Sequence, residues 1–372
     1  MSGAVRASLR TRPSMAWNGA MTADRASELP SAALSPAWTG RTDGDAPEHL
    51  RWHQVVRPAD GRGEPTTPQR HPGAGAPTSG ARSTALIGFA SDEGVRRNHG
   101  RVGAEDGPEA LRGALASLAY LEGTGALVDA GDVSVDRGDD DAPGELEAGQ
   151  AELGTVVSGL LNAHDLAVVL GGGHETAYAS ITGLTGSTRV GAGTRVGILN
   201  LDAHFDLREA PRPSSGTPFL QALRDAEGAE HQLSYAVVGI SEANNTRALF
   251  DTARERGVTW VTDEQAQTAD VTGVRRWVRS FINAVDVLYL TIDLDVLPAA
   301  VAPGVSAPAG FGVPYEVIHA CTLEATQSGK LALADVVELN PALDVDGRTA
   351  KAAARLIHTI VSRHRTDASL LA

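Results

Sequence analysis

Four polar side chains alternate with apolar ones at the end of the stretch GILNLDAHFDLRE, residues 197–209. They are Asp202, His204, Asp206 and Arg208. If the apolar strand continues through them, the alternation of side chains places all four on one face. Two carboxylates and an imidazole suit a cation, and the guanidinium beside them suits an anion. The spacing therefore predicts a cation site with an anion-binding group next to it.

Two further apolar runs end in residues of the same kind. In VVLGGGHET, His174 follows three glycines, which let the backbone turn sharply. In YLTIDLDVL, Asp293 and Asp295 are again two residues apart. Each motif alone also fits a solvated strand end or a helix N-cap, and a lone histidine is more often structural. Together, four aspartates and two histidines at one sheet edge would repel one another without a cation, so we predict a metal site.

The predicted ligands are nitrogen and carboxylate oxygen without sulfur, a set that favours a hard, octahedral divalent ion. Six ligands are too many for one catalytic ion that keeps a position for water. They suit two ions, about 3.5–4 Å apart, that share carboxylates. Manganese fits the ligand types best, while zinc and iron stay open. A water shared by two such ions loses a proton near neutral pH, and the resulting hydroxide is a nucleophile.

These strand ends belong to a regular alternation of short apolar runs and amphipathic stretches that begins at residue 84. The alternation predicts an α/β fold, either a parallel sheet covered on both faces or a closed barrel. In both folds the working residues lie at the carboxyl ends of the strands. Eight strands are predicted, at residues 84–90, 126–133, 166–173, 195–201, 235–241, 258–263, 285–293 and 331–339. Helices are predicted at residues 108–121, 145–164, 248–257, 274–285 and 350–364.

Composition and charge exclude several partners. The 372 residues carry a formal net charge of -14, which argues against nucleic acid and an anionic membrane surface. No apolar run reaches the roughly 18 residues of a membrane span. The one cysteine, Cys321, allows no internal disulfide and no thiolate metal cluster, so a cytoplasmic location is expected.

The N-terminal part of the chain differs from the rest. Residues 1–33, rich in Arg, Ser and Ala, predict a disordered tail, with a transit peptide as the alternative. Residues 34–56 hold Trp38 and Trp52 and are expected to dock on the main body. Residues 57–82 are rich in Pro, Gly and Thr and predict a linker. Residues 83–372 then form the catalytic domain.

The motifs GGGHE, DAHFDLR and IDLDVLPAAVAPGVSAPAG resemble, in the same order, the signatures of the ureohydrolase family, which includes arginase, agmatinase and formimidoylglutamase. The resemblance implies a three-layer α/β/α fold with an eight-stranded parallel sheet, two Mn²⁺ ions per subunit and a homo-oligomer. By similarity, one ion would be held by His174, Asp202, Asp206 and Asp293. The other would be held by Asp202, His204, Asp293 and Asp295.

The same resemblance implies two catalytic roles. Asp206 would pass a proton to the leaving amine. Glu338, in DVVELNP, would hold the cationic head of the substrate, and a strand-end salt bridge is the alternative for this residue.

Arg208 bears on the choice of substrate, because arginases carry Asn at the matching position. An arginine there would repel a guanidinium tail and attract a carboxylate. N-formimidoyl-L-glutamate has two carboxylates, and the GGGHE and DAHFDLR forms most resemble those of formimidoylglutamases. The predicted reaction gives L-glutamate and formamide, a step of histidine degradation. The alternatives are a ureohydrolase acting on guanidinobutyrate or agmatine, a mononuclear zinc deacetylase of the same fold, and a non-catalytic binding protein.

Two other segments are candidates for substrate contact. The turn before the helix that follows the metal motif would offer free backbone N–H groups to an anion. Its residues are Ser215, Gly216 and Thr217. The other segment either forms a rim for the substrate carboxylates or caps the helix that begins near residue 108. Its residues are Arg96, Arg97, Asn98 and Arg101.

Overall fold

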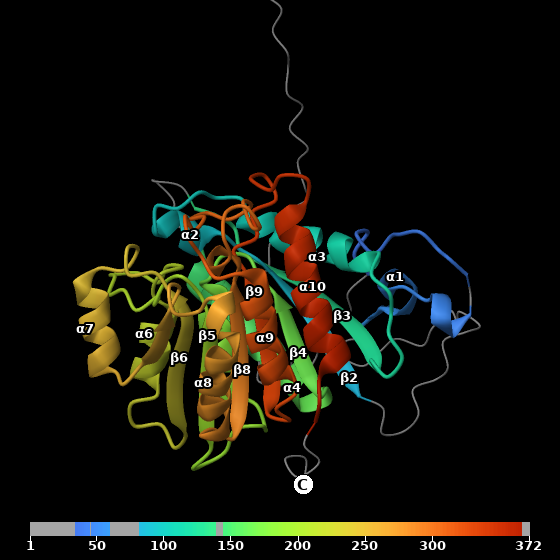
Figure 1. Ribbon diagram of the computed structural model, residues 1–372. Coiled ribbons are helices and arrows are strands. Elements are labelled where there is room, and N and C mark those ends of the chain that lie inside the picture. The colour runs from blue at the N-terminus through green and yellow to red at the C-terminus, as the bar shows by residue number, and fades with distance from the viewer. Residues whose placement is uncertain (1–33, 45, 60–81, 139–143, 367–372) are drawn as a thin grey trace, which may run out of the picture.

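The computed structural model describes residues 34–44, 46–59, 82–138 and 144–366. Their centre is a parallel sheet of nine strands in the order β1-β3-β2-β4-β9-β8-β5-β6-β7 (Figure 1). The strands are β1 (Arg57–Pro58), β2 (Ser83–Ala90), β3 (Ala126–Ser134), β4 (Leu166–Leu170), β5 (Arg195–Leu201), β6 (Gln232–Ile240), β7 (Thr259–Thr262), β8 (Val287–Asp293) and β9 (Leu331–Val337). The predicted tail, residues 1–33, and most of the predicted linker lie outside the described residues.

Helices cover both faces of the sheet, which makes three layers. One layer, in front in Figure 1, consists of α3 (Gly107–Ala116), α8 (Val271–Asn283), α9 (Tyr315–Thr326) and α10 (Arg348–Arg363). The opposite layer consists of α4 (Leu146–Ala163), α5 (Thr176–Thr185), α6 (Pro218–Asp225) and α7 (Arg247–Glu255). Two short helices, α1 (Trp52–Val55) and α2 (Glu93–Arg97), lie in the connections. Among the described helices, none combines the length and the apolarity that a bilayer span requires.

Both faces of the central strands are buried, which explains their continuous apolar sequences. In β2, Leu86 packs into the core beneath the layer of α3, α8, α9 and α10. Ile87 and Phe89 pack into the core beneath the opposite layer, which consists of α4, α5, α6 and α7. All five residues of β4 are buried. Burial on both sides removes the hydrophobic–polar alternation that marks strands with one solvated face.

The predicted α/β fold class is confirmed, and the open sheet rules out the barrel alternative. The predicted number of eight strands is wrong by one. The additional strand, β1, is two residues long and pairs with β3, so it is too short to produce a sequence pattern. Helices α5 and α9 were not among the predicted ones. Most of α5 is buried, and its sequence therefore lacks the polar face by which a surface helix is found.

Residues near the N-terminus pack against the sheet through a buried charged group. The Trp38 indole Nε1–H donates to Asp129 Oδ2 at 2.6 Å, and the Trp38 ring stacks on Trp52 with centroids 6.4 Å apart. The same carboxylate accepts two hydrogen bonds from the fully buried guanidinium of Arg112, at 2.8 and 2.9 Å. Asp129 thus joins the N-terminal segment, α3 and β3.

Replacing Trp38→Phe tests this attachment, because it removes the donor to Asp129 and keeps an aromatic ring. A hydrogen bond to a buried charged group contributes about 1.5–3 kcal/mol. We expect the free energy of unfolding, measured by urea denaturation, to fall by about that amount. A change below about 0.5 kcal/mol, the range of ordinary surface substitutions, would contradict the attachment.

Candidate metal centre

Four neighbouring strands bring the predicted ligands to one edge of the sheet. In the order β4-β9-β8-β5, the carboxyl ends carry His174, Glu338, Asp293 and Asp202. Parallel strands present their carboxyl ends at the same edge, so residues up to 164 positions apart in sequence meet there.

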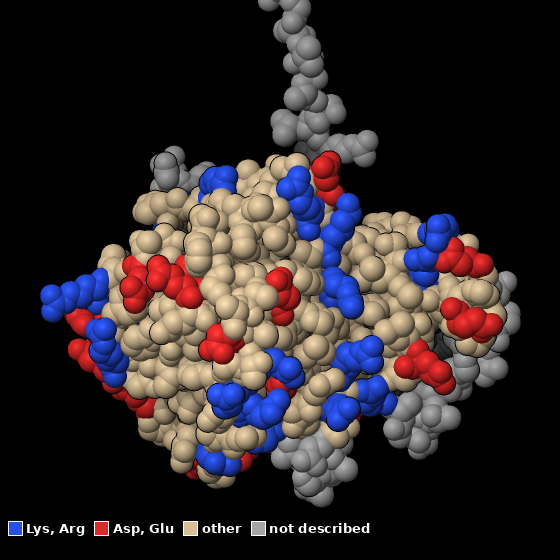
Figure 2. Space-filling view, in the orientation of Figure 1, with Lys and Arg blue, Asp and Glu red and all other residues tan. Residues whose placement is uncertain are grey.

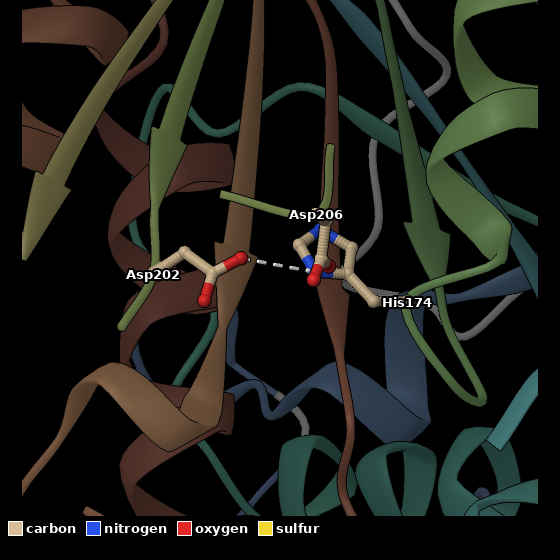
Figure 3. Close-up of side chains that lie close together, drawn as sticks. All are labelled: His174, Asp202 and Asp206. Carbon is tan, nitrogen blue, oxygen red and sulfur yellow. Dashed lines mark ion pairs between the residues drawn. The ribbon is translucent and has the colours of Figure 1, made fainter. Parts of the chain in front are cut away.

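Three carboxylates surround one nitrogen of His174. Its Nδ1 lies 2.9 Å from an oxygen of Asp206, 3.1 Å from Asp293 and 3.2 Å from Asp202; Figure 3 shows the first and last of these side chains. Nδ1 is nevertheless buried without a hydrogen-bond partner, because none of these contacts has hydrogen-bond geometry. A buried nitrogen that faces three oxygens without bonding to any of them points to a common centre between them.

A second group adjoins the first. His204 Nδ1 lies 3.0 Å from Asp295 and 3.5 Å from Asp202. Asp295 also has a buried oxygen without a hydrogen-bond partner. Two sets of three residues could each hold an ion, and Asp202 belongs to both; they are His174, Asp202 and Asp206, and Asp202, His204 and Asp295. Asp293 approaches the first set through His174 but is in neither.

The spacing of these atoms fits a divalent cation. Neighbouring ligands of an octahedral ion with bonds of about 2.1 Å lie about 3.0 Å apart, close to the contacts around His174. Nitrogen and carboxylate oxygen are suitable donors for manganese, iron or zinc. The residues present therefore fit the predicted ions.

Electrostatics at this edge favour a cation. Burial raises the pKa of Asp293, and the charges of Asp295 and Asp202 raise it further. Burial and Asp202 likewise raise the pKa of Asp206. Burial would lower the pKa of His174, but the surrounding carboxylates raise it well above the usual value. Each shift reflects an excess of buried negative charge, which a divalent ion offsets.

The segment after β5 that carries Asp202, His204 and Asp206 is a loop, so the prediction that one face of a strand carries these polar residues is wrong. The strand ends at Leu201, and Asp202 Oδ1 accepts the His204 N–H at 2.6 Å. Asp206 has a positive φ of 48°, which an aspartate adopts only where its surroundings hold it. Arg208 donates from Nη1 to Asn98 Oδ1.

Side chains from β6 and the loop after it hold this segment at Phe205. The Tyr235 hydroxyl donates to Phe205 O at 3.0 Å, and the Phe205 N–H donates to Asn245 Oδ1 at 3.1 Å. Asn200 Nδ2 donates both to Asp202 Oδ2 at 2.9 Å and to the Tyr235 hydroxyl at 3.0 Å. These bonds replace the ladder bonds that a continued strand would make, and they fix the backbone between His204 and Asp206.

A second buried chain of polar groups orients His174. Its Nε2 lies 3.0 Å from Thr291 Oγ1. Burial raises the pKa of the nearby Asp335 carboxyl, and Thr291 opposes that rise. Ser180 and Tyr289 donate to the same carboxylate. Because Nδ1 faces the carboxylates, a neutral ring that binds a cation there carries its proton on Nε2 and donates it to Thr291 Oγ1. In that neutral form Nδ1 is unprotonated and can bind a metal.

The sequence analysis did not find Asn200, Thr291 or Asp335, although a signal exists. Asn200 and Thr291 stand two residues before Asp202 and Asp293, on the same face of otherwise apolar strands. A polar residue in a strand buried on both faces needs a partner, and a ligand at the next position on that face is the nearest candidate.

Glu338 lies beside His174 and not in a salt bridge. Its Oε1 accepts the His174 N–H at 2.8 Å, and its φ of 69° is positive. Burial raises the pKa of Glu338 to about 8, and the charge of Glu175 contributes. Glu338 therefore fixes the backbone of His174, a predicted metal ligand.

Three of the predicted substrate-binding residues, Arg208, Asn98 and Ser215, are joined by hydrogen bonds. Arg208 Nη1 donates to Asn98 Oδ1 at 2.6 Å, and Asn98 Nδ2 donates to Ser215 Oγ at 3.1 Å. The expectation of free N–H groups is wrong for Gly216 and Thr217, because both amides donate to Ser214. An anion at this place would be bound by side chains.

No side chain of the segment around Asn98 caps α3. Arg97 is bonded to Glu93, Glu147 and two carbonyl groups. Arg101 donates to the carbonyl oxygens of residues 305 and 306. Both side chains thus hold loops together.

Comparison with known proteins agrees with this geometry. The pattern of the arginase family matches residues 82–362, three quarters of the chain. The chain belongs to the arginase family. Among its relatives, the formimidoylglutamase of Nocardia farcinica is 54% identical over 89% of this chain and 97% of its own length. That of Rhodococcus jostii is 51% identical over 88% and 95%. The resemblance predicted from the motifs is confirmed.

Solved structures show the same fold at low identity. The formimidoylglutamase of Bacillus subtilis superposes with a TM-score of 0.68 at 22% identity, over 88% of this chain and 95% of its own. A Trypanosoma cruzi formiminoglutamase with Mn²⁺ superposes with a TM-score of 0.65 at 24% identity, over 77% and 95%.

The orientation of His174 generates a prediction. Thr291→Val keeps the shape of the side chain but leaves the His174 Nε2–H without an acceptor. Loss of such a partner typically weakens metal binding 10–100-fold. We expect that range for the Mn²⁺ dissociation constant, measured by equilibrium dialysis, with Thr291→Ser close to the wild type. Equal affinities of all three proteins would show that Thr291 does not orient the ligand.

Proposed function

We propose that this arginase-family protein hydrolyses N-formimidoyl-L-glutamate to L-glutamate and formamide with two Mn²⁺ ions. The observation that carries the proposal is the pair of histidine–carboxylate groups sharing Asp202. Arg208, two residues after Asp206, is joined by hydrogen bonds to Asn98 and through it to Ser215. The relatives named formimidoylglutamase, which match this chain over most of its length, support the choice of substrate.

The metal proposal rests on the ligand atoms. His174, Asp202, Asp206 and Asp293 would hold one ion, and Asp202, His204, Asp293 and Asp295 the other. When bound, the pair of ions supplies a water of lowered pKa and polarises the carbon under attack. Manganese agrees with the donor set and with the Mn²⁺ named in the related T. cruzi structure.

The residues of this chain then position the substrate and move one proton. Water adds its oxygen to the formimidoyl carbon, the bond from that carbon to the α-nitrogen breaks, and the nitrogen leaves as an amine. The Asp206 carboxylate, which lies 2.9 Å from His174 Nδ1, would carry the proton to that nitrogen. Glu338, whose Oε1 is fixed by His174, would hold the cationic formimidoyl head with its other oxygen.

Arg208 supplies the selectivity in this proposal. Its guanidinium would bind a carboxylate of the glutamate part, with Asn98 and Ser215 as neighbours. Agmatine, which is cationic at both ends, would be repelled, whereas guanidinobutyrate has one carboxylate and would be tolerated better. A homo-oligomeric state and a cytoplasmic location stay predictions.

A substrate panel tests the proposal. Manganese-loaded protein is incubated separately with N-formimidoyl-L-glutamate, guanidinobutyrate, agmatine and arginine, and formamide and urea are measured. We expect formamide from the first compound and no urea from the others, with activity lost after chelation and restored by Mn²⁺. Urea release at a higher kcat/KM than formamide release would overturn the substrate assignment.

Replacing Arg208→Asn tests the source of selectivity. Loss of a charged hydrogen-bonded pair costs about 1.5–3 kcal/mol, so KM should rise about 10–100-fold while kcat changes little. The measurement is steady-state kinetics with formamide detection. Wild-type KM in this variant would remove Arg208 from the substrate site.

A further inference from the structure

Three segments meet where the proposed function places the substrate carboxylates. They are the end of α2 with Asn98, the loop after β5 with Arg208, and the turn before α6 with Ser215 and Gly216. Asn98 bonds to both Arg208 and Ser215, and the Arg208 N–H donates to Gly216 O at 2.9 Å. The relative position of these segments therefore decides whether their polar groups converge.

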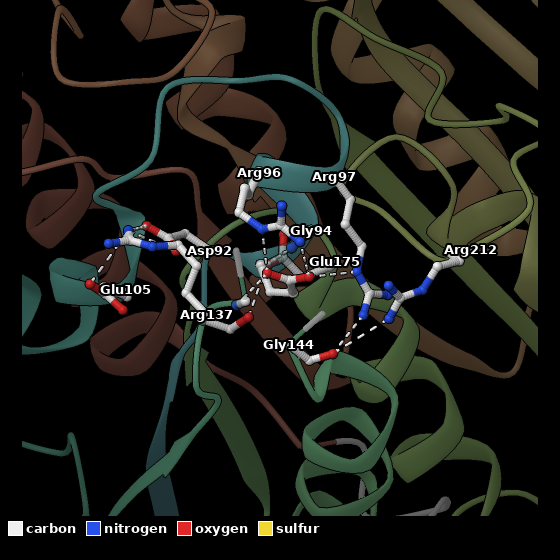
Figure 4. Close-up of polar contacts among 12 residues, drawn as sticks. Asp92, Gly94, Arg96, Arg97, Glu105, Arg137, Gly144, Glu175 and Arg212 are labelled. Atoms are coloured by element: carbon white, nitrogen blue, oxygen red, sulfur yellow. Dashed lines mark hydrogen bonds and ion pairs between the residues drawn. The ribbon is translucent and has the colours of Figure 1, made fainter. Parts of the chain in front are cut away.

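Arg97, the last residue of α2, binds several parts of the chain at once (Figure 4). Its Nε donates to Glu93 at 2.8 Å. Nη1 donates to Glu147 at 2.8 Å and to Pro213 O at 3.0 Å. Nη2 donates to Gly144 O and to Glu147, both at 2.9 Å. A guanidinium has five N–H groups, and these bonds use all five, so Arg97 has none left for a substrate.

The places that Arg97 binds matter for the carboxylate group. Pro213 O belongs to the residue directly before the turn formed by residues 214–217, and Asn98 directly follows Arg97 in the chain. Glu147 lies in the first turn of α4, which is a rigid support. Arg97 thereby holds both the end of α2, which carries Asn98, and the turn that carries Ser215.

Burial makes this attachment rigid. The Arg97 side chain is 6% exposed and that of Glu93 is fully buried. Burial opposes ionisation of Glu93, but hydrogen bonds from Arg96 and Arg97 lower its pKa to about 2. Burial would also lower the pKa of Arg97, but Glu147 and Glu93 raise it. The pair therefore stays charged at any working pH, and removing one member leaves an unpaired buried charge.

We propose that Arg97 is a positioning residue that sets the affinity for the carboxylate end of the substrate without touching it. This inference rests on the proposed function, which places the carboxylates at Arg208, Asn98 and Ser215. None of the bonds described for Arg97 goes to a predicted metal ligand. Its loss should therefore weaken substrate binding, which raises KM, and leave the chemical step, measured by kcat, largely intact.

The experiment compares Arg97→Gln and Arg97→Lys with the control Arg137→Gln. Arg137 belongs to the same network and binds Asp92 at 3.0 Å, and in Figure 4 it lies with Asp92 on the side opposite Arg97. Two quantities are measured on the manganese-loaded full chain. They are amide hydrogen–deuterium exchange in residues 208–217 and the steady-state kinetics of formamide release. Thermal melting checks that each variant is folded.

In Arg97→Gln we expect faster amide exchange in residues 208–217. We also expect KM to rise about 10–100-fold, the size of effect that the loss of a charged hydrogen bond produces, while kcat stays within about threefold of the wild type. Arg97→Lys should be intermediate, since an ammonium keeps the charge but not the planar fork, and it serves if the glutamine variant does not fold. Arg137→Gln should match the wild type in both.

Unchanged exchange would overturn the positioning role, and faster exchange with wild-type KM would reduce Arg97 to a structural role and overturn its link to substrate. A wild type that releases no formamide would refute the proposed function and the substrate part of this inference with it. The exchange measurement would still decide whether Arg97 holds residues 208–217.

Discussion

The repulsion between buried carboxylates at one edge of the sheet is the constraint on which the rest of the structure depends. Asp202, Asp293 and Asp295 are almost fully buried, and Asp206 stands among them. Such a group is stable only with a cation, and two histidines complete two sets of ligands around the shared Asp202. The parallel sheet brings these residues together, and the loop, turn and helix ends around it keep them in place.

Around this cluster of carboxylates, buried polar side chains act two at a time to hold one residue of the site. Thr291 faces Nε2 of His174 and leaves Nδ1 toward the carboxylates, and Glu338 fixes the His174 backbone. Tyr235 donates to the carbonyl oxygen of Phe205, and Asn245 accepts the N–H of Phe205. These two bonds hold the backbone next to Asp206, whose φ is positive. The metal ligands are thus oriented by residues that would bind no ion themselves, as is usual in metal sites.

The sequence was sufficient to predict the strands that carry the site, because burial on both faces leaves continuous apolar runs and each run ends in a ligand. It was also sufficient to predict that the six ligands meet, since carboxyl ends of parallel strands share an edge. It was not sufficient for the loop after Leu201. The period of two in Asp202, His204 and Asp206 is that of a strand, but bonds from Tyr235 and Asn245, which lie 30 and 40 residues from Phe205, override it. Arg97 was equally hidden, because its partners Glu147 and Pro213 are distant in sequence.

Metal analysis after equilibrium dialysis tests the central claim most directly. The chain is stripped with a chelator, dialysed against excess Mn²⁺ and then against buffer, and the bound manganese is counted per chain. The shared position of Asp202 predicts two ions per chain in the wild type, one after His204→Ala and none held tightly after Asp202→Ala. One ion or none in the wild type, or two ions in the Asp202→Ala variant, would contradict the account.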